Sequence, residues 1–162
     1  MQRVYISDTN IWIDFDHAGL LDAVFTLPFT FVSTEFVVSE LNSPLPIDLQ
    51  ERGLVVEPLT SDEVVELSTV MAQHGNSSLA DVSCYLIAKT QGNPLLTGDG
   101  RLRRQAQSDG VQVHGALWLL DQLVSNQVIA TGHAAAALQA MLDAGARLPH
   151  AECTQRMLTW TT

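Results

Sequence analysis

The chain of 162 residues is poor in cysteine and has no long apolar run. Its two cysteines, Cys84 and Cys153, are too few for a disulfide framework, so we expect a reducing, cytoplasmic location. No apolar run approaches the ~18 residues of a membrane-spanning helix. The first ten residues also lack the apolar stretch of a signal peptide. These absences exclude a disulfide-rich secreted protein and a membrane protein.

Basic residues are also scarce, with 8 Lys and Arg against 18 Asp and Glu and a net charge of −10. Taken alone, this balance disfavours a nucleic-acid partner, because phosphate binding normally takes a basic surface. The charge is uneven, however. Residues 1–81 carry a net −11, whereas residues 82–162 carry +1. We therefore ask whether some of the acids are gathered for a purpose.

Hydrophobic residues make up 46% of the chain, which suits one globular domain of this length. Short apolar, β-branched runs alternate with helical patterns, which predicts an α/β fold with a mainly parallel sheet. The strands are expected at residues 3–7, 29–32, 54–57, 95–96 and 111–114. The helices between them are expected at residues 11–15, 19–24, 35–41, 60–76, 78–89, 100–108 and 115–124, with a proline-rich loop at 42–46. We interpret residues 1–125 as the α/β domain and 126–162 as a helical C-terminal extension packed on it.

Four acids are expected to meet at one edge of this sheet. Asp8 and Asp99 each follow a predicted strand, and sites in open α/β sheets form beyond the carboxyl ends of strands. Glu40 ends one predicted helix and Asp81 lies in the first turn of another, where its side chain points back toward the helix N-terminus. Such a cluster would repel itself unless it were protonated or bound a cation.

An oxygen-only donor set favours Mg²⁺ or Mn²⁺ over zinc. Either ion can polarise a phosphodiester and stabilise the leaving oxygen, so the sequence points to phosphodiester hydrolysis. Each acid also has an ordinary structural role open to it. Asp8 could cap a helix, Asp81 could complete a capping box with Ser78, Asp99 could shape a Gly-Asp-Gly turn, and Glu40 could be solvated.

These four acids and their neighbours in the sequence resemble the PIN-domain family of VapC-like ribonuclease toxins. The matching blocks are Ser7-Asp8-Thr9-Asn10, Val38-Ser39-Glu40-Leu41, Leu79-Ala80-Asp81 and Leu96-Thr97-Gly98-Asp99. The resemblance covers roughly residues 2–125 well and the tail loosely. It implies a PIN-like three-layer fold with helices on both sides of the central sheet.

The resemblance further implies a metal-dependent endoribonuclease in which Asp8, Glu40, Asp81 and Asp99 hold Mg²⁺ or Mn²⁺. Asn10 and Thr97 match positions beside the first and last acids. Gly98 departs from the pattern, because members of one subgroup often carry a further acid there. Many family members are toxins that bind an antitoxin and pair as homodimers, so those partners are expected beside an RNA substrate.

The basic half of the chain offers a place for RNA. Arg101 and Arg104 are three residues apart on one predicted helix and share a face, so both could reach a phosphate backbone. Ordinary solvation is the alternative.

Two other functions remain open. Asp8-Thr9-Asn10 and Gly98-Asp99-Gly100 faintly resemble aspartyl-phosphate phosphatases, but Asn10 replaces the second Asp of that family. The sole lysine, Lys89, lies at the far end of its predicted helix from the acids. The other alternative is a catalytically weak PIN-like module that binds RNA or a partner protein, which Gly98 and the scarcity of basic residues favour.

Overall fold

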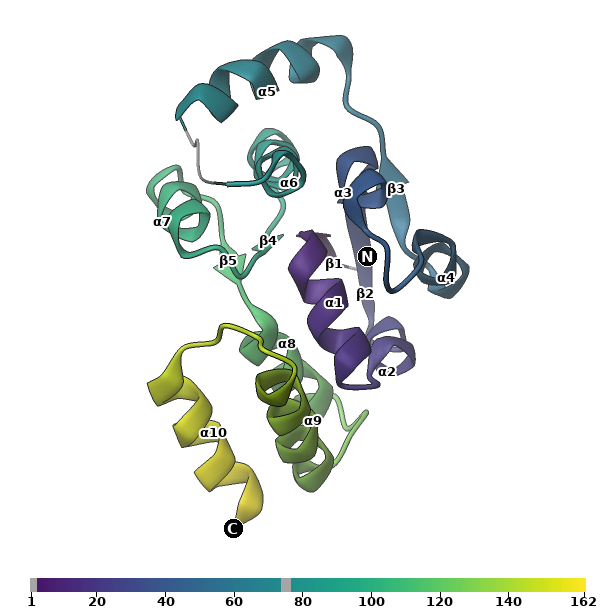
Figure 1. The fold of residues 1–162 in the computed structure, drawn as a ribbon, viewed down its shortest axis with the longest axis vertical. Coiled ribbons are helices and arrows are strands. Elements are labelled where there is room, and N and C mark those ends of the chain that lie inside the picture. The colour runs from purple at the N-terminus through teal and green to yellow at the C-terminus, as the bar shows by residue number, and fades with distance from the viewer. Residues whose placement is uncertain (1–2, 74–76) are drawn as a thin grey trace.

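The computed structural model describes residues 3–73 and 77–162. Its sheet has five parallel strands in the order β3-β2-β1-β4-β5, with β1 in the middle (Figure 1). The strands are β1 (Arg3–Ser7), β2 (Phe29–Thr34), β3 (Val55–Glu57), β4 (Leu95–Leu96) and β5 (Val113–His114). Because all of them run the same way, their carboxyl ends form one edge of the sheet.

Helices connect and follow the strands. They are α1 (Thr9–His17), α2 (Leu21–Phe25), α3 (Glu35–Glu40), α4 (Pro46–Arg52), α5 (Ser61–Gln73), α6 (Leu79–Gln91), α7 (Gly100–Ser108), α8 (Ala116–Ser125), α9 (Thr131–Asp143) and α10 (His150–Thr161). The predicted fold class, an α/β fold with a parallel sheet flanked by helices, is confirmed.

Helices cover both faces of the sheet. Helix α6 packs against β1, β2 and β4, and nine of its residues in succession, 80–88, are buried. Aromatic side chains fill the other face, where Tyr5 and Phe31 lie side by side in register. The ring of Trp12 from α1 meets Phe31 edge-on, and Trp118 from α8 lies 5.1 Å from Tyr5 between ring centroids. The sheet is thus the middle of three layers.

One helix has no counterpart in the sequence prediction. The loop expected at residues 42–46 ends where α4 begins, with Pro46 in its first turn. Proline at the first helical position lacks only a donor that would be unpaired anyway, so it starts this helix. The predicted end of the helix before Ser77, at His74 to Asn76, lies outside the described residues.

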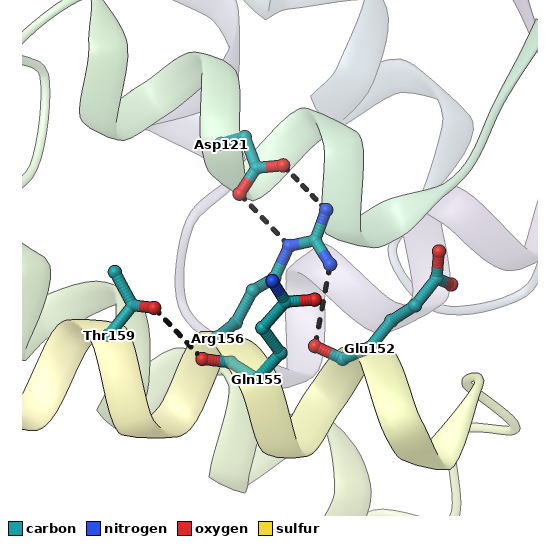
Figure 2. Close-up of polar contacts among 5 residues, drawn as sticks. All are labelled: Asp121, Glu152, Gln155, Arg156 and Thr159. Atoms are coloured by element: carbon teal, nitrogen blue, oxygen red, sulfur yellow. Dashed lines mark hydrogen bonds and ion pairs between the residues drawn. The ribbon is translucent and has the colours of Figure 1, made fainter.

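The C-terminal segment is a pair of helices, α9 and α10, drawn in olive and yellow in Figure 1. Helix α9 packs on α8 and α1, and α10 packs on α9. Arg156 ties α10 to α8 by donating two hydrogen bonds to the Asp121 carboxylate, at 2.6 and 3.0 Å (Figure 2). Whether residue 125 is a domain boundary stays a prediction. Among the described residues, no helix is long and apolar enough to cross a membrane.

Candidate metal centre

Asp8 lies at the carboxyl end of the central strand and is completely buried. One carboxylate oxygen accepts a hydrogen bond from the Ile11 amide and so caps α1. This is the ordinary structural role that the sequence left open for Asp8. The other oxygen accepts from the Thr97 hydroxyl at 2.8 Å and from the Gly98 amide at 3.2 Å. Burial raises the pKa of Asp8 despite these hydrogen bonds, and the charge of Asp99 raises it further. Asp8 therefore caps a helix and also belongs to a group of interacting carboxyls.

Asp99 caps α7 in the same double manner. One oxygen accepts hydrogen bonds from the amides of Arg101 and Leu102, and the other accepts from the Ser77 hydroxyl at 2.8 Å. The amide of Asp99 donates to the hydroxyl of Thr97, whose proton goes to Asp8. Thr97 thus links the first and last acids of the predicted set, and its supporting role in the site stays a prediction.

Asp81 lies in the first turn of α6, where Ser78 caps the helix by accepting the Asp81 amide. Its side chain is buried, and its pKa is raised from 3.8 to about 7. The main cause is burial, followed by the negative charges of Asp8, Glu40 and Asp99. The four predicted acids are therefore close enough to interact electrostatically, although they come from four separate elements.

Two adjoining cavities open beside these acids. One has a volume of about 590 Å³ and is lined by Asp81 and Asp99, and the other, of about 390 Å³, is lined by Glu40 and Asp81. Asn10 lines both, so it lies beside the acids as the resemblance implied. Asp8 is fully buried and lines neither cavity.

Glu40, the last residue of α3, is exposed and accepts a hydrogen bond from the Thr9 hydroxyl at 2.7 Å. Asp99 accepts a hydrogen bond from Ser77 and Asp8 accepts one from Thr97, so three of the four acids have hydroxyl partners. In the described part of the chain, no three His, Cys, Asp or Glu side chains are arranged so that they could hold a metal ion. The carboxylate donor set still suits Mg²⁺ or Mn²⁺ chemically.

Arg101 and Arg104 line neither of the two cavities beside the acids, but they lie close to each other. Both are exposed on α7, and they line a shallow hollow of about 350 Å³ together with Gln73 and Gln105. The shared face that their spacing predicted is therefore present.

Helix α1 places two further side chains beside the acids that were not predicted from the sequence. Asp14 and His17, from the end of α1, line the larger cavity. Burial, and then the charge of Asp8, raise the pKa of Asp14 from 3.8 to about 6. The signal for Asp14 is its spacing of four residues from Asn10, which places both on one face of α1.

Comparison with known proteins agrees with this architecture. The family model described as the PIN domain matches residues 4–161. A PilT N-terminus domain protein from Sulfolobus solfataricus has a similar solved structure, with a TM-score of 0.53, 18% identity, and coverage of 75% of this chain and 93% of that one. A weaker likeness is to the VapBC2 complex of Rickettsia felis bound to a promoter DNA fragment, with a TM-score of 0.46, 16% identity, and coverage of 69% and 98%. No curated protein matches the chain.

Proposed function

Because this chain belongs to the PIN-domain family, we propose that it is a metal-dependent endoribonuclease that hydrolyses RNA phosphodiester bonds. The observation that carries the proposal is the meeting of the four acids at one edge of the sheet. Thr97 joins Asp8 to Asp99 by hydrogen bonds, and Asp81 lines one cavity with Asp99 and another with Glu40. Burial and the charges of the other three acids raise the pKa of Asp81. Carboxylates that repel one another in this way are stable together only when protons or cations offset their charges.

The four acids would hold Mg²⁺ or Mn²⁺, which when bound supplies polarisation of the phosphodiester and activation of water. The residues around them have distinct tasks. Thr97 and the Gly98 amide fix the orientation of Asp8. Asn10, which lines both cavities, would donate a hydrogen bond to the substrate. Arg101 and Arg104 would contact the RNA backbone further along the strand.

Cleavage of a labelled single-stranded RNA in Mn²⁺ tests the proposal. We expect Asp8→Asn to lower the rate of cleavage by at least about a hundredfold. The variant lacks the negative charge that would hold the cation, and with it the electrostatic stabilisation of the transition state. Asp62→Asn, an exposed acid on α5, is the matched control and should cleave as the wild type does. Circular dichroism establishes that both variants fold. Full activity of Asp8→Asn, or of the wild type in excess chelator, would refute the proposal.

One observation favours a second function. The acids are turned to hydroxyl partners rather than grouped as ligands, and Gly98 supplies no further acid. A PIN-like module that binds RNA or a protein without cleaving it would fit both facts. Calorimetric titration separates the two, because a nuclease must bind Mn²⁺ in the millimolar range or tighter, whereas the inert module need not.

The position of Lys89, the one lysine of the chain, does not support the phosphatase alternative. Lys89 lies two turns along α6 from Asp81, and its ammonium group is 3.9 Å from Asp109. A phosphate at Asp8 would therefore lack the neighbouring cation that this chemistry uses.

The protein partners are also proposals. The resemblance implies an antitoxin and a homodimer, and exposed apolar residues such as Val64 and Val65 on α5 offer a surface that either could cover. Light scattering of the purified chain tests the dimer directly, since a monomer at micromolar concentration would contradict it.

A further inference from the structure

A third cavity, of about 430 Å³, lies beside the group of acids. Its walls come from the loop after β4, from the start of α8 and from the segment before α10. It shares Gly98, Gly100 and Arg147 with the larger acidic cavity, so the two adjoin. A chain bound across the acids would therefore have this cavity as its next contact.

The cavity is rich in arginine although the protein as a whole is acidic. Three of the eight basic residues, Arg103, Arg147 and Arg156, line it, with Glu152 as the acid in its wall. The charge of Arg156 is already matched by Asp121, as Figure 2 shows. Within residues 3–73 and 77–162, neither Arg103 nor Arg147 forms an ion pair. Two guanidinium groups are thus available to an anionic ligand.

Arg103 is held in a defined position. It is half-buried, and the one hydrogen bond that its guanidinium donates in the described structure is a long one, 3.5 Å, to the Thr97 carbonyl. Its terminal nitrogen Nη2 lies 2.7 Å from the place where a Cβ on residue 115 would be, so Gly115 makes room for the guanidinium. Most of the donors of Arg103 therefore remain free while the side chain is kept at the cavity.

The lining of the cavity also includes two aromatic rings. The rings of His114 and Trp118 stack in parallel with centroids 4.1 Å apart. Burial, and then the charges of Arg103 and Arg3, lower the pKa of His114, which favours the uncharged form of its ring. The cavity thus combines free guanidinium groups with a flat aromatic surface.

We propose that this cavity, the arginine pocket, binds one nucleotide of the RNA strand next to the cleaved bond, with its phosphate on Arg103 and Arg147 and its base against His114 and Trp118. This inference rests on the proposed function and adds a subsite to it. Arginine binds phosphate through paired, charge-assisted hydrogen bonds, and aromatic rings accept any base. An acidic peptide segment would use the arginines but would gain little from the aromatic rings.

Binding of a fluorescein-labelled oligouridylate to the full chain in excess chelator tests the subsite without cleavage. We expect Arg103→Gln and Arg147→Gln each to weaken binding about tenfold. Each substitution should also reduce the slope of log Kd against log salt concentration by about 0.7. Arg52→Gln is the matched control, because Arg52 pairs with Asp22 and does not line the pocket, and it should bind as the wild type does. Thermal unfolding establishes that the variants fold.

The aromatic rings have their own test with uridine monophosphate and inorganic phosphate as ligands. His114→Ala should weaken binding of the nucleotide at least about fivefold, and His114→Phe should restore it, whereas phosphate binding should change little. Wild-type affinity in both arginine variants would overturn the proposal. So would displacement of the RNA by an acidic peptide at lower concentrations than by the nucleotide.

Cleavage by the wild type in Mn²⁺, measured on the same oligonucleotide, separates the two proposals. If the RNA is cleaved but the arginine variants bind normally, the subsite is wrong and the nuclease stands. If the variants lose binding but the wild type never cleaves, the nuclease is wrong and the pocket stands as a nucleotide site.

Discussion

At the scale of single residues, the acids of the site have structural and chemical roles at once. The carboxylates of Asp8 and Asp99 cap α1 and α7 with one oxygen and contact hydroxyl groups with the other. Sequence reasoning treated capping and catalysis as alternatives for these residues. A carboxylate has two oxygens and room for several donors, so one residue serves both purposes.

The raised pKa of Asp81 has a consequence for stability. Its folded pKa of about 7 lies above its ordinary value of 3.8, so between these values the folded state holds more protons than the unfolded state. The free energy of unfolding of the metal-free protein should therefore fall as the pH rises from about 4 to 7. Asp81→Asn cannot ionise and should show a shallower decline, leaving it on the order of 1 kcal/mol more stable than the wild type at pH 7. Urea unfolding across this range measures the difference.

Asp62→Asn serves as the control for that series, because an exposed acid should keep the wild-type dependence on pH. A decline in Asp81→Asn as steep as that of the wild type would show that the site does not raise the pKa of this carboxyl.

Buried hydroxyl groups below the acids offer a second residue-scale prediction. The Ser33 hydroxyl accepts a hydrogen bond from the Trp12 indole at 3.0 Å and donates one to the Ser7 carbonyl at 2.7 Å. Ser33→Ala leaves two buried groups without this partner, so we expect a loss of about 1–3 kcal/mol in the free energy of unfolding. Thr26→Ala, which removes an exposed hydroxyl, should change it by less than about 0.5 kcal/mol. Equal losses in the two variants would contradict this account.

At the scale of elements, the sequence predicted the order of strands and helices because local patterns specify them. Alternation of apolar runs with capped helices identified the parallel sheet, and the carboxyl ends of its strands located Asp8 and Asp99. Helix α4 was not predicted, because the prolines of residues 42–46 are typical of a loop. Pro46 is in fact the first residue of the helix. The turning of Glu40 toward Thr9 was not predictable either, because that contact joins residues 31 positions apart and depends on tertiary packing.

The attachment of α10 can be tested through Arg156. Its two hydrogen bonds to Asp121 involve side chains that are 23% and 37% exposed, so the pair is partly shielded from water. We expect Arg156→Gln to lower the free energy of unfolding by about 1 kcal/mol. Arg52→Gln breaks an ion pair whose acid is 86% exposed and should cost less. Urea unfolding of both variants makes the comparison, and a larger loss for Arg52→Gln would contradict it.

At the scale of the whole molecule, the acidic and basic side chains are concentrated in different places on the protein. The net charge is −10, yet acids gather at the sheet edge while arginines line the adjoining pocket. An acidic protein can therefore present a local surface for RNA, although we expect its affinity to be modest and strongly dependent on salt and metal.

A bound cation should stabilise the whole fold. A ligand that binds only the folded state raises stability by RT ln(1 + [L]/Kd), which is about 2.7 kcal/mol at a hundred times Kd. We therefore expect millimolar Mn²⁺ to raise the melting temperature of the wild type, and to raise that of Asp81→Asn less. Sodium chloride of equal ionic strength is the control, and an equal rise with sodium would show that the effect is general screening.

The most direct test of the central claim is a crystal structure with Mn²⁺, whose anomalous scattering locates the ion without ambiguity. We predict a peak at the carboxyl edge of the sheet, with carboxylate oxygens of Asp8, Glu40, Asp81 and Asp99 converging on it directly or through water. A crystal at millimolar Mn²⁺ that shows no peak there, or a peak elsewhere while Asp8, Glu40 and Asp99 keep their hydroxyl partners, would contradict the account.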